Sequence, residues 1–292
     1  MSATVLIVGY RAYAELERCL ASLRRHEPAA RVVVVDHAAD EPRGRALVAQ
    51  FPHARYVPRS RNPGFAAGVN ACAALAGEGP LLLLNPDCEL TGPVLAQLAD
   101  VLAGHPGVGI VGGTIVDPAG TIQASGRRFP DATTAVAGRT SLLSRLIPGN
   151  PLTRRNLAAR PPLGMARVDW VAGAFMCVRR ETFDEVGGFD EGFFLYWEDA
   201  DFCQRAANAG WTTVYARTAP VVHTTGQSSR FAPARSLWAF HYSALRYFWK
   251  HGSWLARGAG PLVALGLAGR FLVKLPGRML VAVPTGASRT SG

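Results

Sequence analysis

The chain has 292 residues, 49% of them apolar, and a net charge of +10, which suits one sizeable domain with a basic appendage. No period of about 20 to 50 residues recurs, so a repeat architecture is excluded. The five cysteines form no CxxC pair, and we expect buried thiols in a reducing compartment. The N-terminus has no basic segment ahead of its first apolar run, so we do not expect a cleaved signal peptide.

Strand and helix patterns alternate through the first third of the chain. Short apolar runs predict strands, and apolar residues spaced three or four apart predict helices. The expected strands are residues 4–8, 32–35, 54–57 and 81–84, and the expected helices are residues 13–25 and 66–76. Strands separated by helices are typical of a parallel, Rossmann-like sheet with right-handed crossovers.

The middle of the chain is less regular. Residues 118–167 are rich in Pro, Gly and Arg and predict long loops with short helical pieces. A functional lid and a partly disordered insert fit this segment equally well. Beyond it we expect a strand at 168–178, a helix at 199–209, and short strands at 212–215 and 220–222.

The C-terminal part is basic and aromatic. Eleven Lys and Arg residues follow Asp201 but no Asp or Glu does, so the first 201 residues are close to neutral. Aromatic residues crowd into 238–254, and the longest uncharged run after them, 258–269, is too short to span a bilayer. We expect an interfacial helix on an anionic membrane surface; a helix packed on the domain with a basic, solvated face is the alternative.

Candidate functional residues gather where the predicted strands end. Asn85 and Asp87 follow the apolar run 81–84, and open α/β sheets bind ligands at the carboxyl ends of their strands. Asp87 is well placed to bind Mg²⁺ or Mn²⁺, which takes one or two carboxylates and completes its shell with phosphate and water. A simple turn is the alternative. His223 follows a later strand and is a further candidate ligand, although a lone His is more often structural.

Asp36 and residues 61–70 are candidates for the same edge of the sheet. A carboxylate at the end of a strand can accept hydrogen bonds from a base or ribose, or it can cap a turn. Residues 61–70 form a glycine-bearing turn that enters a helix, and Gly64 and Gly68 permit close backbone approach to an anion. This segment matches neither GxGxxG nor the Walker A pattern, which excludes a dinucleotide or P-loop site.

The segment 187–201 is the richest in acidic residues. Acids close to aromatic residues offer one base of raised pKa among ion-paired neighbours. A sugar transfer with inversion needs such a base to take a proton from the acceptor hydroxyl. Asp199 also heads the predicted helix, so an N-terminal cap is an equally good interpretation of this residue.

In their order and spacing, these motifs resemble the family 2 glycosyltransferases of the GT-A fold, within them the rhamnosyltransferase-like branch that builds bacterial cell-envelope polysaccharides. The resemblance covers about residues 3–230. It rests on Asp36, NPGFAAGVN at 62–70, LNPD at 84–87, WVAGAF at 170–175, GGFDE at 187–191, EDAD at 198–201 and His223.

The resemblance implies an α/β domain of GT-A fold at 1–230, with a mostly parallel sheet flanked by helices. Its nucleotide-sugar half would lie at about 1–117 and its acceptor half at about 118–230. A helical, membrane-associating extension would follow at 231–292.

The resemblance also implies site residues. Asp199 would be the general base, and Asp87 with His223 would bind Mg²⁺ or Mn²⁺. The residues implied for the nucleotide sugar are Asp36, Asn62, Gly64, Phe65, Gly68, Asn70 and Asn85. Those implied for the acceptor and sugar pocket are Trp170, Gly173, Glu198 and Asp201.

The implied reaction is an inverting transfer from a nucleoside-diphosphate sugar, dTDP-rhamnose first and UDP-sugars next, to a lipid-linked or glycan acceptor. It would take place at the cytoplasmic face of the membrane. Residues 9–11 and 37–39 depart from the family pattern on the nucleotide side. One alternative is a catalytically idle relative that scaffolds an envelope-synthesis complex. The other is a nucleic-acid-binding module, although the sequence contains no recognisable nucleic-acid-binding motif.

Overall fold

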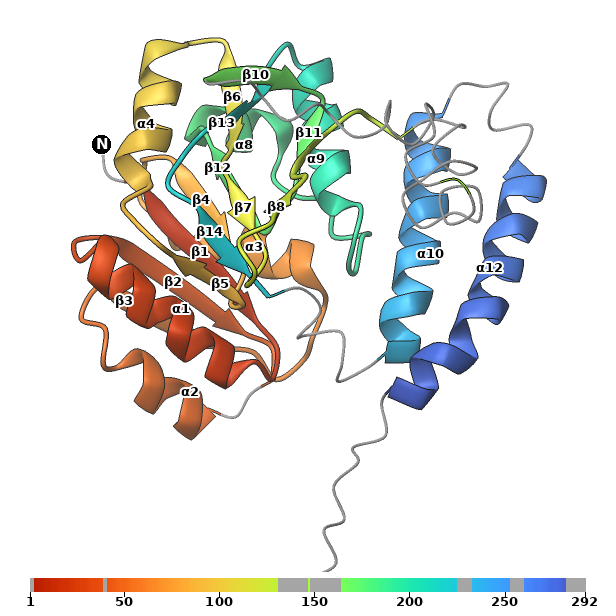
Figure 1. Ribbon diagram of the computed structural model, residues 1–292, viewed down its shortest axis with the longest axis horizontal. Coiled ribbons are helices and arrows are strands. Elements are labelled where there is room, and N and C mark those ends of the chain that lie inside the picture. The colour runs from red at the N-terminus through yellow and green to blue at the C-terminus, as the bar shows by residue number, and fades with distance from the viewer. Residues whose placement is uncertain are drawn as a thin grey trace, which may run out of the picture.

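The computed structural model describes residues 3–38, 41–130, 147, 164–224, 233–252 and 260–281. Its centre is an eight-stranded sheet with the order β10-β13-β6-β12-β4-β1-β2-β3 (Figure 1). The strands are β1 (Thr4–Gly9), β2 (Arg31–Asp36), β3 (Ala54–Pro58), β4 (Leu81–Leu84), β6 (Val108–Gly112), β10 (Met165–Val168), β12 (Phe175–Val178) and β13 (Thr212–Ala216). β1 to β4 run parallel, whereas β12 is antiparallel to both of its neighbours, so the sheet is mixed beyond β4.

Helices cover both faces of this sheet (Figure 1). One face carries α1 (Tyr13–His26), α2 (Glu41–Val48) and α4 (Leu95–Gly104), and the other carries α3 (Phe65–Ala73), α8 (Arg180–Val186) and α9 (Glu198–Asn208). Along β2, Val32 and Val34 pack towards α1, whereas Val33 and Val35 pack towards α3. Because both faces are covered, all four leucines of β4 are fully buried, which explains its unbroken apolar sequence.

Two smaller sheets lie beside the central one. Four short strands pair in the order β5-β14-β7-β8. They are β5 (Cys88–Leu90), β14 (Val221–His223), β7 (Ile115–Val116) and β8 (Ile122–Gln123). In the other sheet β9 (Gly126–Arg127) pairs with β11 (Trp170–Val171). These short strands bring together stretches of chain that are far apart in the sequence.

The structure confirms the early elements and corrects a later one. All six elements expected before residue 85 form close to their predicted bounds, and all five cysteines are buried. The single strand predicted at 168–178 is wrong, because the chain there divides into β10, β11 and β12, each paired with a different partner strand. The segment 118–167, expected as loops, contains β8 and β9; its residues 131–146 and 148–163 lie outside the described residues.

Two long helices form the C-terminal part, α10 (Pro233–His251) and α12 (Gly260–Val281). They pack against each other beside the α/β body (Figure 1). Among the helices described, none has the length and apolar content needed to cross a bilayer. α10 is attached to the body through side-chain contacts given below, and it also carries exposed aromatic residues. The domain boundary at residue 230 stays a prediction.

Candidate active site

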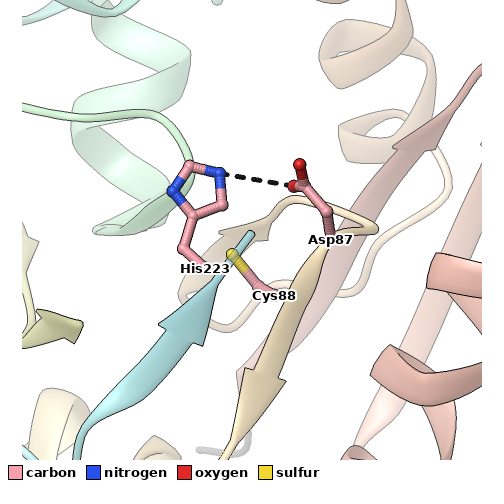
Figure 2. Close-up of side chains that lie close together, drawn as sticks. All are labelled: Asp87, Cys88 and His223. Atoms are coloured by element: carbon pink, nitrogen blue, oxygen red, sulfur yellow. Dashed lines mark ion pairs between the residues drawn. The ribbon is translucent and has the colours of Figure 1, made fainter. Parts of the chain in front are cut away.

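Asp87 and His223 lie side by side just beyond the carboxyl end of β4 (Figure 2). Asp87 lies between β4 and β5, and the pairing of β14 with β5 sets His223 opposite Cys88. His223 Nε2 is 3.3 Å from Asp87 Oδ1, with the two side chains 13% and 7% exposed, respectively. The fold thus brings together the two residues that the sequence analysis named as metal ligands; their role as ligands stays a prediction.

The donor atoms of this cluster suit a hard divalent cation. Cys88 belongs to the cluster, since one ligand atom from each of the three residues lies within 4.8 Å of the others. However, the Cys88 thiol donates to Ala174 O over 3.5 Å, and burial raises its pKa well above the ordinary value. A neutral thiol is a poor ligand, so the carboxylate of Asp87 and the imidazole of His223 are the groups that fit Mg²⁺ or Mn²⁺.

Asp199 lies in the first turn of α9 and contacts the turn before β12. Its Oδ2 accepts a hydrogen bond from Gly173 N at 3.1 Å, and its Oδ1 accepts one from Ala200 N at 2.8 Å. The next residue of the turn, Ala174, accepts a hydrogen bond from Asn85 N at 3.0 Å. One turn therefore connects the carboxylate of Asp199 with the chain that leads to the metal cluster, which sets both acids at the same edge of the sheet.

The electrostatics of α9 favour Asp199 as a base. Burial raises the pKa of Asp199 above its ordinary value, although the amides of Gly173 and Ala200 and the charge of Arg127 oppose this shift. Burial, and then the charge of Asp199, raise the pKa of Glu198 well above its ordinary value. Glu198 Oε2 has no hydrogen-bond partner among the described residues. The proton affinity of both carboxylates is therefore raised, and this Oε2 of Glu198 lies beside the candidate base Asp199 in the first turn of α9.

The backbone that enters α9 is held in an uncommon conformation. Tyr196 and Trp197 have φ angles of 67° and 70°, in the left-handed region, which costs on the order of 1–3 kcal/mol for each non-glycine residue. Their rings pack on α10: the Trp197 ring centroid lies 5.8 Å from that of Phe240 and 5.5 Å from that of Tyr247. Contacts with α10 therefore support the turn that orients Asp199.

Asp201 is an anchor for α10. It is fully buried, and it pairs with Arg205 Nε at 2.8 Å, Lys250 Nζ at 2.8 Å and His251 Nε2 at 2.7 Å. Burial alone would raise the pKa of Asp201, but the hydrogen bonds from His251 and Lys250 and the charge of Arg205 hold it below its ordinary value. These contacts attach the C-terminal helices to α9; the expected place of Asp201 in the acceptor pocket stays a prediction.

Asn70 also serves packing in this structure. Its Nδ2 donates to Phe189 O and to Glu191 Oε1, both at 2.9 Å, and its Oδ1 accepts from Phe189 N at 2.9 Å. The amide thus fastens the GGFDE segment to α3. This use of both amide atoms does not support the expected contact between Asn70 and the donor.

The carboxylate of Asp36 is buried and held by two tyrosines. Tyr13 and Tyr56 donate their hydroxyls to Oδ2 at 2.8 and 2.7 Å, and Ala38 N donates to Oδ1 at 2.9 Å. The two hydroxyls fix the orientation of this side chain at the end of β2. The contact of Asp36 with a base or ribose stays a prediction.

The glycine-bearing turn packs on the segment that precedes α9. Asn62 Oδ1 accepts a hydrogen bond from Gly64 N at 3.0 Å, and Phe65 N donates to Phe194 O at 2.8 Å. Gly64 has a φ of 114°, and a Cβ there would lie 2.4 Å from Phe194 O. Only glycine fits this position, so Gly64 is required for packing whether or not it also meets the donor.

Gly68 and Trp170, two further residues predicted for the site, make close contacts in the structure. A Cβ on Gly68 would lie 2.5 Å from Val8 Cγ1, so this glycine lets α3 approach β1 closely. Trp170 Nε1 donates to Arg128 O at 2.8 Å, and the guanidinium of Arg127 lies over the Trp170 ring at 4.9 Å. The charge of Arg127 acts on the carboxylate of Asp199, so Arg127 links Trp170 with Asp199.

Comparison with known proteins decides the family. The model of glycosyltransferase-like family 2 matches residues 2–239. This chain belongs to that family. A Mycobacterium tuberculosis protein named N-acetylglucosaminyl-diphospho-decaprenol L-rhamnosyltransferase is 32% identical over 263 residues, which cover 86% of this chain and 85% of the relative.

Two solved structures share the fold of this glycosyltransferase. GalNAc-T7 with UDP, GalNAc and Mn²⁺ has a TM-score of 0.58 at 17% identity, over 78% of this chain and 44% of that one. A mannosyltransferase from Pyrobaculum calidifontis in complex with GDP-Man and Mn²⁺ has a TM-score of 0.55 at 18% identity, over 96% of this chain and 78% of that one. The likeness confirms the predicted GT-A fold of the glycosyltransferase.

The sequence analysis missed several residues that contact or act on the candidate site residues. Gln123 lies 3.3 Å from the His223 ring, Arg127 favours the ionised form of Asp199, and Tyr13 and Tyr56 hold the Asp36 carboxylate. Gln123 and Arg127 belong to strands of two residues each, which are too short to give a periodic signal. The tyrosines read as ordinary helix and strand residues, so only the fold shows their contacts.

Proposed function

We propose that this glycosyltransferase transfers rhamnose from dTDP-rhamnose, with inversion, to a hydroxyl of a lipid-linked acceptor in cell-envelope polysaccharide synthesis. The relative named for rhamnosyl transfer to N-acetylglucosaminyl-diphospho-decaprenol supports the sugar and the class of acceptor. The observation that carries the proposal is that the partly buried carboxylate of Asp199 lies at the same sheet edge as the pair Asp87 and His223.

In the proposed reaction Asp199 takes the proton of the acceptor hydroxyl. Each of its oxygens accepts one main-chain N–H and keeps a lone pair for that proton. The acceptor oxygen forms a bond to the anomeric carbon while the bond to the nucleoside diphosphate breaks on the opposite face. The proton stays on Asp199 and the nucleoside diphosphate leaves, so the anomeric configuration is inverted.

Other side chains would hold the reactants in place. Asp87 and His223 would bind Mg²⁺ or Mn²⁺, which supplies neutralisation of the charge on the leaving diphosphate. Glu198 Oε2 has no partner in the described ranges and would be available for a hydrogen bond with the sugar or acceptor. Gly173 contacts Asp199, and Trp170 packs under Arg127; both would shape the acceptor side of the pocket.

We also propose that α10 and α12 rest on an anionic membrane surface, with the protein peripheral on the cytoplasmic face. Trp238 and Tyr242 stack at 4.9 Å on the exposed side of α10, where Trp249 is exposed too. α12 exposes Leu265, Leu272 and Val273. Trp and Tyr favour the headgroup layer, and each Lys or Arg near anionic lipid contributes about 1 kcal/mol. This position would bring the site close to a lipid-linked acceptor.

The transfer proposal is tested with dTDP-rhamnose, UDP-sugars and an N-acetylglucosaminyl-diphospho-polyprenol acceptor, with the product followed by mass spectrometry and its anomeric configuration by NMR. We expect dTDP-rhamnose to be the preferred donor and the product to be inverted. Asp199→Asn should abolish turnover and keep donor binding. A wild-type chain that binds donors but transfers none would support the idle scaffold instead, and full activity of Asp199→Asn would rule out this residue as the base.

A further inference from the structure

We propose that Gln123 is a positioning residue for the metal site. It fixes the hydrogen of the His223 ring on Nδ1, so that Nε2 offers its lone pair to a divalent cation held together with Asp87. The inference deepens the proposed function and rests on it, because the cation site is part of that function.

The first step is the direction of the Gln123 amide. Its Nε2 donates to the main-chain oxygen of His223 at 3.0 Å, and its Oε1 lies 3.3 Å from His223 Nδ1. Because the amide nitrogen is used on the main chain, the atom that faces the ring is the carbonyl oxygen, which can only accept. His223 Nδ1 must therefore carry a hydrogen.

The second step is the state of the other ring nitrogen. In a neutral imidazole with its hydrogen on Nδ1, Nε2 carries a bare lone pair. Here Nε2 lies 3.3 Å from a carboxylate oxygen of Asp87. The dashed line in Figure 2 marks this pair. Two lone pairs that face each other at this distance repel unless a proton or a cation lies between them. Both an ordinary ion pair and a pair of ligands for one cation have this geometry, and the Mn²⁺ measurement described below distinguishes them.

The third step considers whether the Gln123 amide is needed for the pairing of β8 instead. β8 is an edge strand of two residues, and its main chain pairs with β7 without help from this side chain. The amide makes its two contacts with one residue, and that residue is the imidazole ligand. Partners that orient a metal-binding His typically change metal affinity by about 10- to 100-fold when removed.

The experiment measures Mn²⁺ binding to the full chain by electron paramagnetic resonance of the free ion. Gln123→Met keeps the length of the side chain and loses both hydrogen bonds; we expect it to weaken Mn²⁺ binding by about 10- to 100-fold. Gln123→Glu keeps an acceptor for Nδ1–H, and we expect binding equal to or tighter than that of the wild type.

A matched control comes from a second glutamine. Gln97 Nε2 donates to Pro93 O at 2.7 Å, and its Oε1 accepts from Ala219 N at 3.0 Å, two residues before β14. Gln97→Met therefore loses two hydrogen bonds to the main chain close to the same small sheet but touches neither ligand. We expect unchanged Mn²⁺ binding in this variant.

A tautomer measurement gives a second, independent readout. Nitrogen-15 NMR of wild-type His223 without metal, at a pH where the ring is neutral, should show Nε2 without a hydrogen. An Nε2–H tautomer would overturn the inference, even if Gln123→Met failed to fold.

The binding data can also overturn it. Wild-type affinity in Gln123→Met, or an equal loss in Gln97→Met, would do so. If Asp87→Ala abolishes Mn²⁺ binding and Gln123→Met does not, only this inference fails. If Asp87→Ala binds Mn²⁺ like the wild type, or if the wild type takes up no Mn²⁺, the proposed metal site itself is wrong.

Discussion

Because Asp201 attaches α10 to α9, we expect removal of its charge to lower the free energy of unfolding substantially. In Asp201→Asn the three basic side chains that pair with Asp201 lose a common, fully buried carboxylate. Removing one partner of a buried ion pair typically costs about 3–5 kcal/mol. The side chains of Lys250 and Arg205 are 31% and 20% exposed, so solvent recovers part of the loss. We therefore expect a decrease of about 3 kcal/mol in the free energy of unfolding.

Urea unfolding of the full chain measures this cost, with Asp184→Asn as the control. Asp184 pairs with Arg180 at 2.9 Å, but its side chain is 55% exposed, so the loss there should be under about 1 kcal/mol. Activity should fall as well in Asp201→Asn, because α10 supports the Tyr196–Trp197 turn ahead of Asp199. A loss at pH 7 no larger than that of the control would refute the role of Asp201 as the anchor.

The pH dependence supplies a further check on the same variant. The pKa of Asp201 is lower in the folded chain than in the unfolded one, so its stabilisation is complete above its unfolded value of about 4. The stabilisation is lost as the pH falls through the folded value. The difference in stability between the wild type and Asp201→Asn should therefore shrink as the pH falls below about 4. A difference that grows below about pH 4 would contradict this assignment.

Three other predictions concern the base, the glycine turn and the C-terminal helices. Arg127→Ala removes a charge that favours ionised Asp199, so the acidic limb of the pH profile of kcat/KM should move to higher pH; an unmoved limb would contradict this. Gly64→Ala should lower the Tm and Gly104→Ala should not, since a Cβ at Gly104 meets nothing within 4 Å. A chain ending at Gly252 lacks α12 and should sediment less with anionic vesicles while it still binds donor; unchanged sedimentation would argue against the membrane role of α12.

Local patterns were sufficient for six elements before residue 85, although they did not predict α2. The apolar runs of β1, β2 and β4 and the spacing of α1 depend on neighbours along the chain, which is why their bounds could be predicted closely. The strand predicted at 168–178 failed for the opposite reason. Its residues are apolar enough for one strand, but they divide among three strands that pair with β13, with β9, and with β4 and β6. Local sequence does not specify pairing between distant segments.

The same distinction between local pattern and contact with distant segments applies to the candidate site. Asp87 and Asp199 could be proposed from the sequence because each belongs to a recognisable motif at the end of a strand or the start of a helix. Asp201 and Asn70 belong to equally recognisable motifs, but their side chains are engaged in packing contacts with α10 and with the GGFDE segment. A motif gives the type of residue at a position, whereas the use of its polar atoms depends on which distant groups come within hydrogen-bonding distance.

The sequence by itself determined the family, the α/β core and the chemical nature of the two principal acids, because burial patterns and short motifs are properties of contiguous residues. Only the tertiary structure decided that His223 faces Asp87, that Gln123 faces His223, and that α10 is joined to α9 through Asp201. Each of those contacts joins segments separated by long stretches of chain. Their geometry follows from how the sheets and helices close around the core, which no local pattern encodes.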